Sequence, residues 1–208
     1  MNRLRPASIL LPVLLLAGCS GGLLGPRGQF AVFTLPAPAP AASASAAALP
    51  VRLAVDLPVA HGLLDGTGIV VSPAPARLAV YAGARWDEPP PRLLRRRLLE
   101  VLQAGGLPGA IPGDSGALVD FTLESDLYAF QAQVREGRVR VEVVLQVRLL
   151  ENASRRLLAQ RRFAVHVPAR DRRAPQLVDA LGLASDMLAR QVAAWAAAQL
   201  REAPAGTR

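Results

Sequence analysis

The sequence predicts an α+β fold: a two-layer sandwich in which two helices pack on one face of a largely antiparallel sheet. Three successive segments, 117–133, 137–151 and 155–167, alternate apolar and polar side chains, as half-buried strands do. Two further segments carry an apolar stripe at helical spacing. A sheet with one apolar face and helices with one apolar face bury these surfaces against each other, which predicts the two layers.

The first 18 residues have the layout of a secretory signal peptide. Arg3 and Arg5 supply positive charge, and an apolar run follows from Ala7 to Leu16. That run is too short for a transmembrane helix, which needs about 20 residues to cross the hydrocarbon core. We therefore assign residues 1–18 to a cleaved signal and expect an extracytoplasmic protein.

Cys19 is the only cysteine of the chain, so it has no intramolecular disulfide partner. The run Leu16-Ala17-Gly18-Cys19 resembles a bacterial lipobox. The resemblance implies cleavage before Cys19, which then carries a diacylglycerol and an N-acyl chain such as palmitate, with no other cofactor. Several acyl chains on one residue hold a protein firmly to a membrane. Ser20 follows where retained lipoproteins of enterobacteria have aspartate, which favours sorting to the periplasmic face of the outer membrane.

The basic character of the chain does not indicate a nucleic-acid-binding protein. All 24 basic residues are arginine, and loss of Arg3 and Arg5 with the signal leaves 22 against 16 acidic residues. Aromatic residues make up only 4% of the chain, too few for base-stacking platforms. An extracytoplasmic location and this composition together exclude nucleic acid as the expected partner.

The mature chain is expected to begin with a tether and linker at 19–48, before a globular domain at 49–202 and a polar tail at 203–208. Within the first part, a Gly-rich tether precedes a short strand at 29–35, and the Ala/Pro-rich run 36–48 is assigned no secondary structure.

The globular domain opens with three predicted strands. Residues 51–57 alternate as a half-buried strand, with Val51 to Leu57 at odd positions facing inward. Strands at 68–72 and 76–82 follow, separated by Pro73 and Pro75.

A helix is predicted after Asp87, which can cap it, and the proline run suits its first turn. Its apolar stripe consists of Leu94, Leu98, Val101 and Leu102. We interpret Arg95–Arg97 as mostly the solvated face, and Gly105-Gly106 as the end of the helix.

The three alternating strands form the predicted meander, with turns at 135–138 and 151–154. A long helix closes the domain from Pro175 to Leu200, and Trp195 lies on its apolar stripe.

No catalytic or metal site is predicted. The run Gly113-Asp114-Ser115-Gly116 matches a serine-protease signature, but His61 and His166 lie in the wrong context to activate Ser115, so a turn is the better interpretation. Two histidines and a lipidated cysteine cannot supply three or four metal ligands.

In order along the chain, these features resemble the ABC-type transport auxiliary lipoproteins, the PqiC-like family. The carrying residues are the lipobox with Cys19, Phe33-Thr34-Leu35, Pro58, the run 64–70, Tyr81 before Arg85-Trp86-Asp87-Glu88-Pro89, and Trp195 in the last helix.

The resemblance implies a non-enzymatic, outer-membrane-anchored periplasmic component of an ABC/Mce-type system that moves lipid between membranes. Expected partners are an inner-membrane ABC permease or Mce-domain protein and outer-membrane lipids, and Arg95 and Arg96 are the candidate partner-binding residues. The alternative is a structural or assembly lipoprotein of an outer-membrane complex, of the LptE type. A homo-oligomer is left open.

Overall fold

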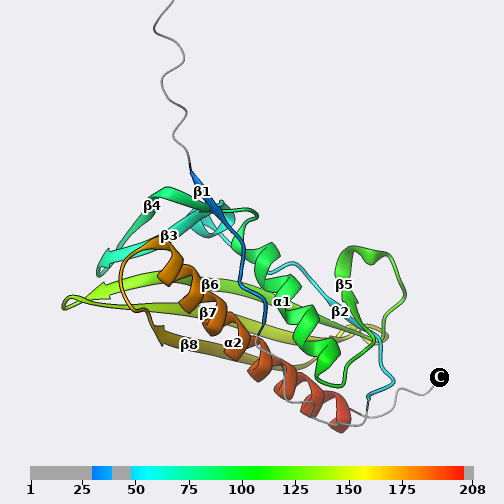
Figure 1. The fold of residues 1–208 in the computed structure, drawn as a ribbon. Coiled ribbons are helices and arrows are strands. Elements are labelled where there is room, and N and C mark those ends of the chain that lie inside the picture. The colour runs from blue at the N-terminus through cyan, green and yellow to red at the C-terminus, as the bar shows by residue number, and fades with distance from the viewer. Residues whose placement is uncertain (1–29, 39–47, 204–208) are drawn as a thin grey trace, which may run out of the picture.

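The computed structural model describes residues 30–38 and 48–203 (Figure 1). Over these residues the chain forms one sheet and two α-helices. The strands and α-helices are β1 (Ala31–Phe33), β2 (Leu53–Val55), β3 (Gly68–Ala74), β4 (Arg77–Trp86), α1 (Pro90–Ala104), β5 (Ala110–Pro112), β6 (Phe121–Arg135), β7 (Arg138–Glu151), β8 (Arg156–Pro168) and α2 (Ala174–Glu202).

The predicted meander is the centre of the sheet. Strand β7 pairs antiparallel with β6 along its whole length and with β8 along most of it. In the turn between β6 and β7, Glu136 and Gly137 both have positive φ, as the tight turns of two-residue hairpins require. Alternation along β7 places its apolar residues, from Val139 to Leu149, in the core. The meander prediction is confirmed.

Strands β1, β3 and β4 form a second part of the sheet, which we call the wing. Strands β3 and β4 are an antiparallel hairpin, whereas β1 pairs parallel with β4, and β3 pairs parallel with β6. The sheet is therefore mixed, because the chain passes from β3 to β6 through β4 and α1 and arrives in the same direction. The α+β class is confirmed, and the largely antiparallel description holds for the long strands.

Two details of the predicted strands are wrong. Pro73 lies inside β3 rather than between strands, at a register shift between Val71 and Ala74 where the ladder is already interrupted. Residues 51–57 are not a half-buried strand: only Leu53–Val55 pair, with β5 on one side and β6 on the other, and all three are buried. Leu57 is 41% exposed.

Both helices cover the same face of the sheet, as predicted, and they also pack against each other (Figure 1). The core lies between the layers. Its largest fully buried side chains include Trp86 on β4, Phe130 on β6 and Leu94 on α1. Trp195 of α2 is half-buried and meets Phe163 of β8 edge to face, with ring centroids 5.8 Å apart.

Candidate functional site

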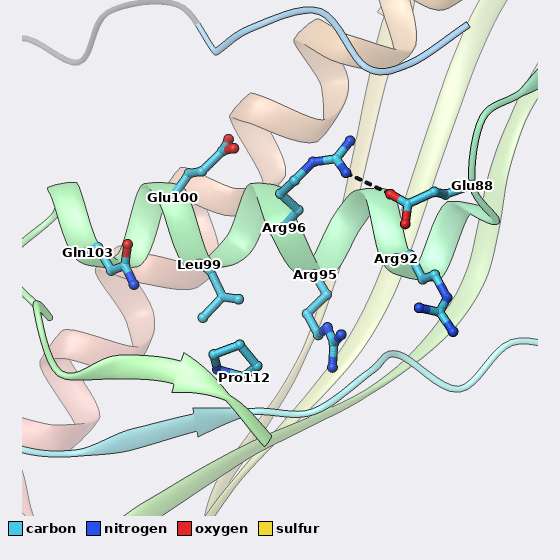
Figure 2. Close-up of a pocket in the computed structure, with 8 residues that line it drawn as sticks. All are labelled: Glu88, Arg92, Arg95, Arg96, Leu99, Glu100, Gln103 and Pro112. Carbon is cyan, nitrogen blue, oxygen red and sulfur yellow. Dashed lines mark hydrogen bonds and ion pairs between the residues drawn. The ribbon is translucent and has the colours of Figure 1, made fainter. Parts of the chain in front are cut away.

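Three arginines of α1 line a hollow of about 390 Å³ on the outer side of that helix (Figure 2). Arg92 and Arg95 extend from the side of α1 on which Pro112 lies, whereas Arg96 extends from the other side toward Glu88. The remaining lining residues are Leu99, Glu100 and Gln103. The lining of the hollow thus combines acidic, amide and apolar side chains with three guanidinium groups.

Arg95 turns toward the loop before β6. Its Nη1 donates to Asp114 Oδ2 at 3.1 Å, and the arginine side chain is only 17% exposed. The hydrogen bond from Arg95 holds the pKa of the Asp114 carboxyl below its ordinary value. Asp114 and Ser115 lie in a short 3-10 turn (Gly113–Ser115), which confirms the turn interpretation of the protease-like run.

Arg96 reaches the N-terminal arm, residues 30–38. Its guanidinium donates to Glu88 Oε2 at 2.6 Å and to the Thr34 hydroxyl at 3.1 Å. The arm is also tied to the end of β4, because the Asp87 N–H donates to the Phe33 carbonyl at 2.7 Å. Arg96 therefore bridges the start of α1 and the arm.

Arg97 is buried, with a side chain 4% exposed, so the prediction that Arg95–Arg97 mostly form a solvated face is wrong for this residue. Its guanidinium pairs with Asp186 of α2, donates to Glu100 at 3.2 Å and donates to the Pro36 carbonyl of the arm. Burial lowers the pKa of Arg97 from its ordinary value. One side chain thus joins α1, α2 and the arm.

Gly182 explains why the arm can lie so close to α2. A Cβ at this position would stand 2.8 Å from Pro36 Cδ and 3.1 Å from Pro36 Cγ. Leu35 is 7% exposed and belongs to the core. The run 36–48 is predicted to have no secondary structure, and its residues 36–38 have none, although Pro36 packs against α2. Residues 39–47 lie outside the described part.

Most of the other predicted site residues are buried or half-buried. Trp86 is 1% exposed and contacts Phe130 edge to face, with centroids 5.7 Å apart. Pro58 is buried and Tyr81 half-buried. Asp87 does not cap α1 as predicted: Pro89 holds the N-cap position, and Asp87 Oδ1 accepts the Glu88 N–H.

Sequence reasoning missed Arg97, Asp186, Thr34 and Gly182. A signal was present, because Arg97 follows Leu93 by four residues and Leu94 by three, which places it within the apolar stripe. A glycine inside a helix costs about 1 kcal/mol relative to alanine, so Gly182 also indicated a close approach. Cys19, the predicted lipidation site, lies outside the described residues.

Within residues 30–38 and 48–203, no three His, Cys, Asp or Glu side chains are grouped so as to hold a metal ion. In the same ranges, neither helix is both long and apolar enough to span a bilayer.

The family of ABC-type transport auxiliary lipoprotein components matches residues 33–193. The chain belongs to this family. The match runs from Phe33 in β1 into α2, so it includes the contacts of Arg96 and Arg97 with the arm. The resemblance stated from the sequence is thereby confirmed, and the coarse role, a lipoprotein component of ABC-type transport, follows from the family.

Solved structures show the same fold. A DUF330-family protein of Xanthomonas campestris is 20% identical with a TM-score of 0.73, over 83% of this chain and 97% of that one. An uncharacterised protein is 17% identical with a TM-score of 0.65, over 81% and 99%. A hypothetical protein of Chlamydia trachomatis is 8% identical with a TM-score of 0.51, over 74% and 99%. No curated protein matches the chain.

Proposed function

We propose that the protein is held at the periplasmic face of the outer membrane by lipids on Cys19 and serves there as the auxiliary component of an ABC/Mce-type lipid transport system. The observation that carries this proposal is the family match over residues 33–193, combined with the lipobox that precedes it. An auxiliary component needs an anchor and a surface for partners, and it needs no catalytic group of its own.

The arginine face of α1 is the surface we assign to a transport partner of acidic character, an Mce-domain protein or permease. Arg92 lines the hollow together with Arg95 and Arg96, and both of the latter are already held by acidic or hydroxyl groups of the chain itself. Such arginines are fixed in position before a partner arrives, which lowers the entropy lost on binding.

The anchor is tested by Cys19→Ser. Because the acyl chains hold the protein to the bilayer, we expect the variant to appear in the soluble periplasmic fraction instead of the outer-membrane fraction, with an unchanged circular dichroism spectrum. Membrane fractionation and immunoblotting measure this. A variant that still sediments with outer membranes and resists aqueous extraction would show that the anchor lies elsewhere.

The partner surface is tested by Arg95→Gln/Arg96→Gln. We expect folding and outer-membrane location to persist and capture of the Mce partner to weaken mainly at low ionic strength, since exposed charges are screened by salt. A matched control is Arg161→Gln/Arg162→Gln on β8, which alters the same net charge on exposed residues of another element. If both double variants lost partner capture to the same extent, α1 would not be part of the interface.

A further inference from the structure

The outward face of the wing, on the side of the sheet away from the helices, exposes apolar side chains. Phe30 and Val32 in the arm and β1 are 54% and 53% exposed, and Leu78 and Val80 of β4 are 52% and 48% exposed. The register places Val32 opposite Arg85 on the neighbouring strand, and Leu78 and Val80 share one side of β4 by alternation. Elsewhere on the sheet, the outward positions of the meander carry mainly polar side chains, among them Glu124, Asp126 and Arg148, with Leu157 of β8 as an exposed apolar residue.

The charge of the wing is uniformly positive. From Gly66 to Trp86 the chain has no aspartate or glutamate, and the arm and β1 have none either. Arg77 and Arg85 are both exposed, and the Arg85 guanidinium lies 5.9 Å from the centroid of the Phe30 ring. Apolar side chains flanked by arginines are the composition of surfaces that lie in the interface of an anionic bilayer.

The arm fixes where the chain from Cys19 joins the domain. Thr34 and Pro36 are held by Arg96 and Arg97, so the described chain begins at the wing, at Phe30. Eleven residue steps separate Cys19 from Phe30 and span at most about 40 Å when fully extended. Helix α2, with 29 residues, is about 43 Å long at 1.5 Å per residue. The anchor thus keeps the wing within about one domain length of the bilayer.

We propose that the outward face of the wing, centred on Phe30, Val32, Leu78 and Val80 with Arg85, rests on the anionic phospholipid bilayer that holds the lipids of Cys19. The proposal rests on the lipidation of Cys19, which is part of the proposed function. Because this face is opposite the helix layer, the docked domain presents α1 and its arginines away from the membrane. The anchor gives attachment, and the wing gives orientation.

The first test measures depth in the membrane. Lipidation consumes the thiol of Cys19, so Leu78→Cys supplies the single free thiol of the lipidated full-length protein. A polarity-sensitive fluorophore is attached there, and the protein is reconstituted in vesicles of phosphatidylethanolamine and phosphatidylglycerol that carry nitroxide-labelled acyl chains. The matched control is Leu157→Cys on β8, at the opposite edge of the sheet and 47% exposed against 52% for Leu78.

We expect a blue shift and strong quenching by the lipid nitroxides at position 78, and neither at position 157. Equal, weak quenching at both positions would overturn the proposal. A blue shift at position 78 without quenching by lipid would also overturn it, and would identify a protein, such as a second copy of the chain, as the occupant. A separate control labels free thiols in the protein without the Leu78→Cys or Leu157→Cys substitution. A labelled Cys19 would show that lipidation has failed, independently of whether the wing docks.

The second test does not depend on lipidation. The mature chain carrying Cys19→Ser is sedimented with the same anionic vesicles and with phosphatidylcholine vesicles. An arginine near an anionic surface contributes about fivefold to partitioning, so Arg85→Gln should reduce binding to anionic vesicles by about fivefold. Arg162→Gln, at an exposed position of β8, should leave binding nearly unchanged. The same loss in both variants, or no binding to anionic vesicles by the parent, would refute docking through the wing.

Discussion

The meander and the wing belong to one sheet, yet their outward faces differ in chemistry. On the meander, Arg148 bridges Glu124 and Asp126 at 3.2 and 2.5 Å, and Glu142 accepts from Gln131 at 3.3 Å. On the wing, the exposed outward positions include Val32, Leu78 and Val80, beside Arg85. Only the first pattern is that of a strand facing water. The difference indicates that the wing has another neighbour, whereas the meander is a scaffold.

The largest expected effect concerns the joint between the two regions. Trp86 of the wing lies against Phe130 of the meander, fully buried. Trp86→Ala should lower the free energy of unfolding by about 3–5 kcal/mol, because it leaves a large cavity at the joint. Urea unfolding followed by circular dichroism measures this. Leu118→Ala, at a position 84% exposed, is the control and should change it by less than about 0.5 kcal/mol. If Trp86→Ala and the parent unfolded at the same urea midpoint, the contact of Trp86 with Phe130 would not be what stabilises the junction between wing and meander.

The second effect concerns the buried contacts of Arg97 that attach the arm to the helices. Arg97→Ala removes the buried cation that faces Asp186 and the Pro36 carbonyl, and should cost about 3 kcal/mol of unfolding free energy. The double variant Arg97→Met/Asp186→Leu should recover most of that loss, since apolar side chains of similar size replace buried ion pairs well.

The double variant also tests whether the meander depends on the arm. Hydrogen exchange should show that Arg97→Met/Asp186→Leu loosens the arm near Thr34 while the amides of β7 stay protected, because the meander does not depend on the arm. Loosening spread evenly over β7 would mean that the arm supports the whole sheet.

The smallest effect concerns Asp56, beside the polar face of the meander. Burial, followed by the negative charge of Glu124, raises the pKa of the Asp56 carboxyl above its ordinary value. The folded protein therefore binds this proton more tightly than the unfolded chain does, so ionised Asp56 destabilises the fold at neutral pH, and the penalty is relieved as the pH falls through the raised pKa.

Asp56→Asn, which mimics the protonated side chain, should accordingly be slightly more stable than the parent at neutral pH. The advantage should shrink as the pH approaches the ordinary aspartate value of about 4. Urea midpoints across this range measure it, and Asp65→Asn at an exposed carboxyl is the control. An advantage that stays constant with pH would contradict the assignment to Asp56 ionisation.

Elements with a local signal are predictable from the sequence alone. Alternation from Val139 to Leu149 predicts β7 because successive side chains of a strand point to opposite faces, and the stripe through Leu94, Leu98 and Leu102 predicts α1 because helical neighbours lie three and four residues apart. The family was likewise accessible, since ordered short motifs along the chain carry the resemblance.

Features that depend on residues distant in sequence required the tertiary structure. Leu53–Val55 is fully buried and pairs with β5 on one side and β6 on the other, and no pattern within 51–57 states which strands are its neighbours. Arg95, Arg96 and Arg97 are identical and consecutive, yet they bind a loop, the arm and a second helix. Each residue of a helix advances by about 100°, so the partner of each arginine is set by what the fold places around the helix.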